Sequence, residues 1–344
     1  MPDAVTLPSD LYTPLLAQEY LEYQFYGGLG VLDRCVGTTP DKPIQLGGLG
    51  FLQGGSYIDR PRFSEISGLI VRRDNTSFAA VDIAKLSSTN DKAVLLSLRS
   101  KPIGIPMADV LRIAKTNRGA VELEVARQSA NAIRKYIQNA LLYAIRAAVL
   151  GMTNAAHTKT VWATDARTNM STALLAQGLR LMGDNAEDIS CWCFRSEVAF
   201  DLLEHQLGQG NLIADRAANG AVATLNKPYE VVDSAALTVA DGGFDKYYSI
   251  GMGAGAVFLD VLSAPIVAPP QIVNNAEVPY MVTRVDMDFA IAIKGVAWDS
   301  ANGGANPAVA TTLATLSGCS WGSSQRVWAS TSRWSLLTSV APAR

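Results

Sequence analysis

Charged side chains are scarce in this 344-residue chain. Asp, Glu, Lys and Arg make up only 17% of it, whereas 49% of the residues are hydrophobic. A typical soluble domain is about 25% charged, so we expect much of this surface to be covered, most simply by further copies of the same chain. The formal net charge is −2. A dedicated nucleic-acid-binding protein needs clustered positive charge for its phosphate contacts, and this composition argues against that class.

Long apolar runs are missing as well. None approaches the roughly 20 residues that a membrane-spanning helix requires, so we expect no membrane association. The first ten residues, MPDAVTLPSD, contain no basic patch followed by an apolar run, which predicts no secretory signal. We therefore expect synthesis in a reducing cytoplasm.

Cysteine is also rare, with four residues in the whole chain. So few cysteines do not make a disulfide framework. Cys191 and Cys193 share one face of an expected strand and could form half of a zinc site, but Cys35 and Cys319 stand alone and supply no second pair. We expect buried free thiols and no metal site.

Recognised catalytic motifs are lacking. The two histidines, His157 and His205, have no motif around them, so no Ser-His-Asp or Cys-His set can be placed. The glycines of residues 251–255 resemble a dinucleotide loop only faintly, because the third is misplaced and more strand follows. Asp286 and Asp288 share one strand face without a third metal ligand. We predict no catalytic residue, no cofactor and no metal.

A long helix is the strongest signal that is present. From Gly119 to Gly151 no proline interrupts a run of helix formers, and small or apolar side chains recur every fourth residue from Val121 to Val149. At 1.5 Å per residue this helix is roughly 45 Å long, two to three times the usual length. Its first half carries cations, whereas residues 140–150 are apolar nearly all round. The second half should therefore be covered on most sides.

The first 56 residues are expected to form an N-terminal arm. A short helix from Ser9 to Tyr26 is dense in aromatic residues, and residues 27–56 are rich in glycine. We interpret the glycine-rich part as an extended arm rather than a packed element. An aromatic terminal segment should dock onto another surface, and we expect that surface to belong to another copy of the chain. The aromatic contact candidates are Tyr20, Tyr23 and Phe25.

Residues 57–101 are predicted to form a basic β-hairpin, which we call the extended loop. Strand patterns at 66–73, 78–86 and 93–99 are separated by polar turn signals. Between Arg60 and Lys101 there are eight Lys and Arg against four Asp and Glu. A two-stranded hairpin is unstable alone in water, so it packs either on its own domain or, as we favour, across a neighbouring subunit. The candidates for pairing with acidic groups there are Arg60, Arg62, Arg72, Arg73 and Lys85.

Helices and strands follow the long helix without regular alternation, which predicts an α+β fold. The elements expected from the pattern are a strand at 160–164, a helix at 171–182, a strand at 189–194, a helix at 196–205, a loop at 211–225, a buried strand at 229–233, a glycine-interrupted strand at 246–260, a link at 265–270, one or two strands at 282–296, a helix at 307–316 and a closing strand at 327–337.

This order of elements resembles the major capsid protein of tailed double-stranded DNA bacteriophages, the Hong Kong 97-type capsid fold that is shared with encapsulins. The glycine-rich arm, the basic hairpin and the long helix resemble the N-arm, extended loop and spine helix of that family. SCWCFRSEVAFDLLEHQL at 190–207 resembles a strand and helix of its axial domain. KPYEVVDSA at 227–235 and YYSIGMGAGAVFL at 247–259 are similar to its proline-led and glycine-broken strands. FAIAIKGVAW at 289–298, followed by Asn306-Pro307, is similar to the end of its peripheral domain.

The resemblance implies a shell protein with a particular division of the chain. The implied parts are an N-terminal arm at 1–56, the extended loop at 57–101, a peripheral domain with the spine helix at 102–154, an axial domain at 155–264 and the rest of the peripheral domain at 265–344. The implied partners are copies of the chain in hexamers and pentamers of an icosahedral shell, a portal, separate scaffolding or decoration proteins, and packaged double-stranded DNA in non-specific contact. The axial tips, around 211–225, would meet at the centres of these rings. Assembly is expected in the bacterial host cytoplasm, and the final location is the virion capsid.

Two departures from the family pattern and two alternatives stay open. No charged helical scaffolding extension precedes the arm, and no lysine–asparagine crosslink can be assigned, since Lys85 and Lys92 would be guesses. An encapsulin-like nanocompartment would share the fold but enclose a cargo enzyme. An α+β enzyme would be a monomer or dimer rather than a megadalton particle.

Overall fold

The structure is a computed structural model. It describes residues 14–26, 32, 34–47, 53–54, 57–63, 88–116, 120–151, 158–160, 170–181, 187, 189–208, 227–241, 244–274, 279–294, 296–298, 304, 306–309, 321–323 and 334–342. Among these residues, no helix is both long and apolar enough to span a membrane.

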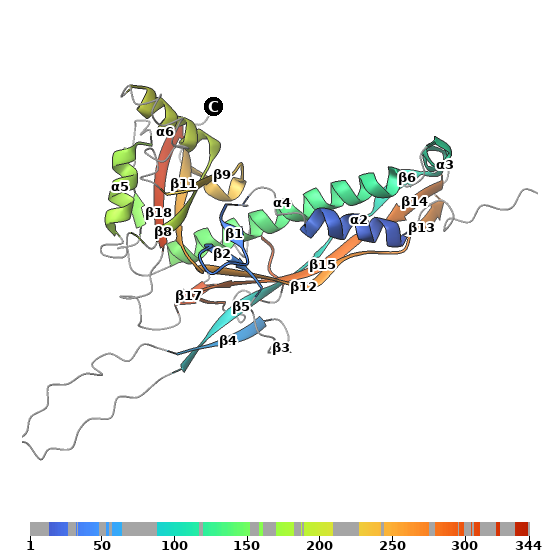
Figure 1. The fold of residues 1–344 in the computed structure, drawn as a ribbon, viewed down its shortest axis with the longest axis horizontal. Coiled ribbons are helices and arrows are strands. Elements are labelled where there is room, and N and C mark those ends of the chain that lie inside the picture. The colour runs from blue at the N-terminus through green and yellow to red at the C-terminus, as the bar shows by residue number, and fades with distance from the viewer. Residues whose placement is uncertain are drawn as a thin grey trace, which may run out of the picture.

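A long helix lies along a long twisted sheet, and a second unit stands at one end of both (Figure 1). The helix is α4, Ala120–Gly151. We call its partner the long sheet. In spatial order its seven strands are β1 Val36–Gly37, β2 Ile44–Leu46, β12 Val257–Val267, β15 Val285–Ile293, β5 Ser88–Arg99, β4 Tyr57–Phe63 and β3 Gln53–Gly54.

The second unit, which we call the end unit, is a six-stranded sheet covered by two helices. The helices are α5 Thr172–Leu181 and α6 Ser196–Gly208. The strands are β7 Thr158–Thr160, β18 Trp334–Pro342, β11 Phe244–Gly253, β8 Ile189–Phe194, β9 Tyr229–Val231 and β10 Thr238–Asp241, with a 3-10 turn η3 at Ala235–Leu237.

A small sheet closes the opposite end of the molecule, which we call the tip (Figure 1). It pairs β13 Gln271–Asn274 with β14 Pro279–Thr283, and β14 with β6 Ile103–Pro106. Helix α3, Met107–Thr116, follows β6 directly. A two-stranded ladder of β16 Val296–Trp298 and β17 Trp321–Ser323 lies near the base of β5.

Helix α4 confirms the main prediction from the sequence, since it begins within one residue of the expected start and ends at Gly151. Side chains on its first half alternate between buried and exposed, whereas nearly every residue from Ala140 to Val149 is buried. The buried stripe, which includes Ile133 and Ile137, packs in the main core together with Phe289 of β15. The core therefore lies between α4 and the long sheet.

The N-terminal helix α2, Pro14–Tyr26, folds back onto its own chain along α4 (Figure 1). Ala17 and Leu21 are fully buried there. The amide of Gln18 also binds the backbone of β12: Nε2 donates to Pro265 O at 2.5 Å, and Oε1 accepts from Val267 N at 2.8 Å. The expectation that this helix rests on another copy is wrong for its buried face, because α4 and β12 of the same chain supply the apolar surface.

We expect Gln18→Ala to destabilise the subunit by about 1–3 kcal/mol, because Val267 N and Pro265 O would lose their partner in a half-buried site. The measurement is urea unfolding of the unassembled chain. Glu19→Ala is the matched control, since Glu19 is exposed on the same helix. Equal stability of the two variants would show that the Gln18 hydrogen bonds contribute nothing.

The glycine-rich segment is packed, contrary to the expectation for residues 27–56, at least from residue 34 to residue 47. β2 pairs in parallel with both β1 and β12. Gly255 N and Val257 N donate to Lys42 O and Pro43 O at 2.8 and 3.0 Å, and Ile44 is fully buried. This segment lies where the long sheet meets the end unit, so it completes the junction instead of extending away from it.

The strand expected at 246–260 is two strands that belong to different sheets. β11 lies in the end unit and β12 in the long sheet. The chain turns between them at Gly255, whose φ of 62° is in the left-handed region that favours glycine. β12 then continues to Val267, so the first half of the link expected at 265–270 is strand.

The closing strand also differs from its expected position. β18 pairs with β11 along nine residues, from Trp334 to Pro342, and so lies in the end unit rather than with the rest of residues 265–344.

Two further elements differ from their expected form. Residues 307–309 are not helical, whereas a helix was expected to begin there. β9 ends at Val231, lies at the edge of its sheet and is only partly buried, although a buried strand to residue 233 was expected.

β8 confirms its expected bounds and separates two cores. Cys191 and Cys193 face the main core, whereas Trp192 and Phe194 face a second core under α5 and α6. This alternation follows from the two-residue repeat of a strand. The expectation of free thiols holds for Cys193 but is wrong for Cys191, which forms a disulfide with Cys35 across a sequence separation of 156.

Candidate assembly interface

The base of the extended loop is an antiparallel ladder. β4 pairs with β5 from Tyr57↔Val94 to Phe63↔Ser88, and β5 pairs with β15 on its other side. The strand expected at 93–99 is therefore part of a longer one, and residues 57–63 form its partner. The strands expected at 66–73 and 78–86 lie outside the described residues.

The five basic candidates fall on this loop. Arg60 and Arg62 lie on β4, opposite Asp91 and Thr89 of β5. The backbone ladder holds both at fixed register positions on β4, which lies between β5 and the edge strand β3 of the long sheet. Arg72, Arg73 and Lys85 lie outside the described residues, so their place at an interface stays a prediction.

The three aromatic candidates all lie on α2. Tyr20 is partly buried against the main core of its own chain, so it serves the subunit fold. Tyr23 is 77% exposed and is available to a neighbour. The side chain of Phe25 lies outside the described part of the helix. Tyr23 therefore remains a contact candidate, and the role of Phe25 stays a prediction.

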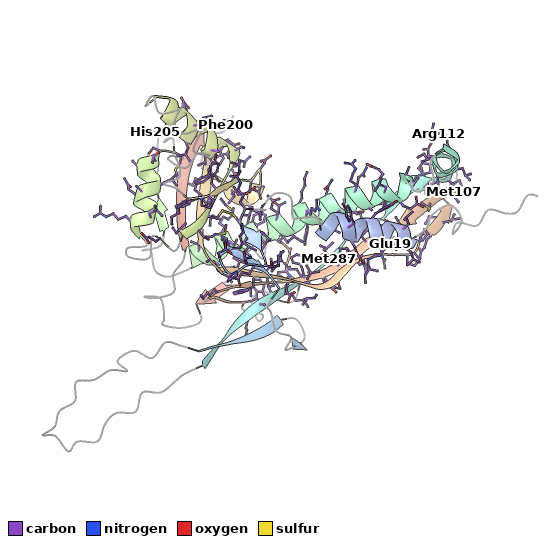
Figure 2. The ribbon with its side chains drawn as sticks, viewed as in Figure 1. Glu19, Met107, Arg112, Phe200, His205 and Met287 are labelled. Atoms are coloured by element: carbon purple, nitrogen blue, oxygen red, sulfur yellow. A yellow bond between two sulfur atoms is a disulfide. The ribbon has the colours of Figure 1, made fainter. Side chains whose placement is uncertain are left out.

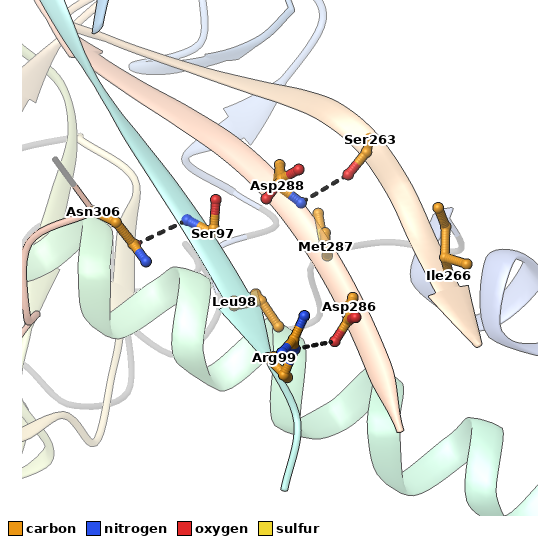
Figure 3. Close-up of a pocket in the computed structure, with 9 residues that line it drawn as sticks. All are labelled: Ser97, Leu98, Arg99, Ser263, Ile266, Asp286, Met287, Asp288 and Asn306. Carbon is orange, nitrogen blue, oxygen red and sulfur yellow. Dashed lines mark hydrogen bonds and ion pairs between the residues drawn. The ribbon is translucent and has the colours of Figure 1, made fainter. Parts of the chain in front are cut away.

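A groove of about 600 Å³ crosses the long sheet near the bulge of β12 (Figure 3). The pairing of β12 with β15 shifts register on both sides of Ser263. At this bulge the backbone amide of Asp288 donates to the side chain of Ser263 instead of to a backbone carbonyl. The distance from Asp288 N to Ser263 Oγ is 2.8 Å. The lining residues are Ser97, Leu98, Arg99, Ser263, Ile266, Asp286, Met287, Asp288 and Asn306.

One wall of the groove is the part of β5 beyond Val94, where no described strand pairs with β5 on the side of β4. β4 covers β5 only as far as Val94. Beyond that point Ser97 N donates to Asn306 Oδ1 at 2.9 Å, and Asn306 holds a left-handed backbone with φ of 47° (Figure 3). A side chain thus satisfies one amide of an edge that could otherwise pair with another strand.

The groove combines carboxylates with an exposed apolar side chain. Asp286 pairs with Arg99 at 3.0 Å and with Arg284 at 3.5 Å. Asp288, which alternates along β15 with the buried Met287 and Phe289, makes no ion pair with a described residue. Ile266 is 56% exposed beside them. Unpaired negative charge next to apolar surface suits a basic, partly apolar segment.

Other exposed apolar side chains lie at the ends of the molecule. Phe200, which is 68% exposed, and Leu203 are one turn apart on the outer side of α6. Figure 2 shows Phe200 at the top of the end unit. Ile272 and Val273 are exposed on β13, the edge strand of the tip. Both ends of the subunit therefore present surface that a neighbour could cover.

Chemical sites are not apparent in the described part of the chain. No group of three or more His, Cys, Asp and Glu residues there could hold a metal ion. His205 lies in the last turn of α6, as expected, and His157 lies outside the described residues. The aspartates at 286 and 288 share one strand face, as expected, and form part of the groove.

Sequence reasoning missed Ile266, Ser263 and Asn306, because no local pattern marks a strand bulge or the residue that covers a distant edge.

Comparison with known proteins identifies the family of this chain. A family model described as Gp13-like, "Major capsid protein 13-like", matches residues 52–325, which is most of the chain. This chain belongs to that family. It is therefore a structural protein that forms a capsid shell, and the resemblance inferred from the order of its elements is confirmed.

Solved structures confirm the fold of this capsid protein. The capsid of Ralstonia phage GP4 is 10% identical and matches 76% of this chain and 86% of its own, with a TM-score of 0.51. The Cyanophage Pam1 capsid asymmetric unit is 13% identical, with coverage of 76% and 86% and a TM-score of 0.50. A Mycobacterium phage Cain structure is 16% identical, with coverage of 71% and 81% and a TM-score of 0.50. None of the curated proteins compared with the chain matches it.

Proposed function

We propose that this capsid protein builds the icosahedral shell around the double-stranded DNA genome of a tailed bacteriophage, as hexamers and pentamers of one chain. The family match supports the shell. The separated contact surfaces on α2, the groove, α6 and β13 support several different neighbours for each copy. Repetition of heterologous contacts about a fixed rotation closes rings and shells.

The extended loop is the part that we assign to the principal contact. Its base projects from the long sheet on the β4–β5 ladder. The 24 residues between Phe63 and Ser88 can reach roughly 40 Å when they run out and back at about 3.3 Å per residue. We propose that this loop crosses the next subunit, where its arginines meet the groove of Asp288 and its apolar residues meet Ile266.

The net charge of the chain bears on how the shell contacts the packaged genome. A net charge of −2 gives no strong field toward DNA, so we propose that the packaged genome meets the inner wall in weak contacts that do not depend on sequence. Portal, scaffolding and decoration proteins complete the proposed assembly. We place assembly in the bacterial cytoplasm and the final product in the virion.

Expression of the full chain should yield megadalton particles or ring-shaped capsomers. Size-exclusion chromatography with light scattering gives the mass, and negative-stain electron microscopy gives the shape. Particles from infected cells should protect DNA from nuclease. A monomer or dimer at micromolar concentration would contradict the shell, and shells filled with an enzyme instead of DNA would contradict the genome container.

A further inference from the structure

Three cysteines meet at the junction between the long sheet and the end unit. Cys35 forms the disulfide with Cys191, and the two Cα atoms are 6.1 Å apart. Cys193 lies two residues further along β8 on the same face, with its sulfur 3.9 Å from the sulfur of Cys35. All three side chains are fully buried in the main core. Cys35 therefore has two sulfur neighbours on one strand.

The disulfide joins two parts of the fold that are far apart in the sequence. Cys35 begins the segment that passes through β1 and β2 into the long sheet, and Cys35 O accepts from Ile44 N at 2.9 Å. Cys191 lies on the central part of the end unit, next to β11. Near Cys35, Arg34 Nη1 donates to Tyr229 O of β9 at 3.3 Å. A bond at this point fastens the N-terminal segment to the sheet on which the end unit is built.

We propose that Cys35, Cys191 and Cys193 form one redox site, in which Cys35 is the common partner and either cysteine of β8 can close the bond. In the reducing cytoplasm the site holds three thiols, and it closes when the subunit meets a small-molecule disulfide outside the cell. This proposal concerns the subunit, and it holds whether or not the shell encloses DNA.

The closing reaction is a pair of thiol–disulfide exchanges. Local opening of the segment that begins at Cys35 admits the small disulfide. The Cys35 thiolate attacks it, forming a mixed disulfide and releasing one small thiol. The Cys191 thiolate then attacks the Cys35 sulfur, the Cys35–Cys191 bond forms, and the second small thiol leaves. The two cysteines are oxidised, the small disulfide is reduced, and the two protons pass from the cysteines to the released thiols.

In the closed state Cys193 is the cysteine of the site that is not part of the disulfide. Burial, with a smaller contribution from the charge of Glu230, raises the pKa of the Cys193 thiol well above its ordinary value. The thiol is therefore mostly protonated, and its attack on the finished bond is slow. When Cys191 is missing, the same thiol is the nearest sulfur to Cys35, so it should take the place of Cys191.

The test uses the full chain with single cysteine-to-alanine changes, because alanine places no unpaired hydroxyl in the buried site. Each protein is incubated with oxidised glutathione, blocked with N-ethylmaleimide and digested with chymotrypsin. Cleavage after Trp192 separates Cys191 from Cys193, so mass spectrometry identifies which one is bonded to Cys35. Circular dichroism establishes that each variant is folded.

We expect a Cys35–Cys191 peptide from the wild type and from Cys193→Ala, a Cys35–Cys193 peptide from Cys191→Ala, and neither peptide from Cys35→Ala. A reductant should lower the melting temperature of the oxidised wild type by on the order of 5 °C and leave that of Cys35→Ala unchanged. A folded Cys191→Ala without a Cys35–Cys193 peptide would overturn the proposal. Equal melting of the oxidised and reduced wild type would do the same.

The second arm uses wild-type cells opened directly into denaturant that contains N-ethylmaleimide, so that buried thiols also react. We expect these cells to contain the three thiols in alkylated form. A bond that is already complete at that moment would overturn the claim that the site closes after release from the cell. Unassembled subunits give these readouts too, so failure of the shell proposal would leave this test intact.

Discussion

Particle formation should be lost when residues 64–87 are replaced by a four-residue Gly/Ser turn. The change keeps the β4–β5 ladder, which ends at Phe63 and Ser88. The subunit core lies between α4 and the long sheet and should be unaffected. We therefore expect a folded, soluble subunit with wild-type circular dichroism and no particles in light scattering or electron micrographs. Normal particles from this variant would show that the loop is not an arm between subunits.

A charge exchange locates the partner of the loop. Asp288→Lys in the groove should impair assembly, because it places positive charge opposite a basic loop. Arg72→Glu with Arg73→Glu should impair assembly as well. Combining the three changes should restore particles at least in part, since the signs are again opposite. Additive loss in the triple variant would place the acceptor of these arginines somewhere other than Asp288.

Arg146→Ala should strongly destabilise the subunit by removing a buried link between α4 and the end unit. Arg146 is 8% exposed and donates to Ala236 O at 2.5 Å and to Thr238 O at 3.4 Å. Its guanidinium lies 5.1 and 5.4 Å from the rings of Tyr143 and Tyr248. Truncation would remove the donor that Arg146 supplies to two carbonyls and create a cavity. The expected loss is about 3 kcal/mol in urea unfolding of the unassembled chain.

The same helix offers a matched control. Arg127 lies on the exposed first half of α4 and pairs with Glu124 at 2.7 Å. Exposed pairs of this kind contribute little, so Arg127→Ala should leave the unfolding midpoint almost unchanged. Arg146→Lys should fall between the two, because one ammonium cannot reproduce the planar guanidinium between two rings. If Arg146→Ala behaves like Arg127→Ala, the buried guanidinium does not hold the two parts together.

Burial also acts on the charge of Arg146. Desolvation lowers the pKa of its guanidinium, and the nearby tyrosines Tyr248 and Tyr143 oppose that effect. No carboxylate among the described residues pairs with it, so the backbone carbonyls and the aromatic rings are what keep the cation in place. Arg146→Met, which fills the volume without charge, should cost less than Arg146→Ala.

The elements that the sequence predicted well are those whose pattern is local. α4 could be located because its apolar repeat runs for 32 residues with a glycine at the end. β8 could be located from its short apolar run, of which Cys191 to Phe194 alternate between two buried faces. In both cases the period of the side chains decides the structure before any distant partner is considered.

The sequence predicted only part of the candidate contact site. The basic loop could be identified from its composition, and Tyr23 from the aromatic cluster around it. The groove could not be identified, because Ser263, Asp288 and Asn306 come from three separate segments. Their proximity depends on a register shift between β12 and β15, and no residue type marks such a shift.

The chain by itself determined that a long helix is present, that helices and strands follow it without regular alternation, and that the order of elements resembles that of a capsid protein. These features follow from side-chain period and from the sequence of turns. Tertiary structure alone decided that α2 and residues 34–47 pack on their own subunit, that β18 joins the end unit, and that Cys35 reaches Cys191. The reason is that glycine-rich and aromatic segments gain stability from any apolar surface they can cover. Which surface lies within reach is known only after α4, β12 and β8 have been placed in space.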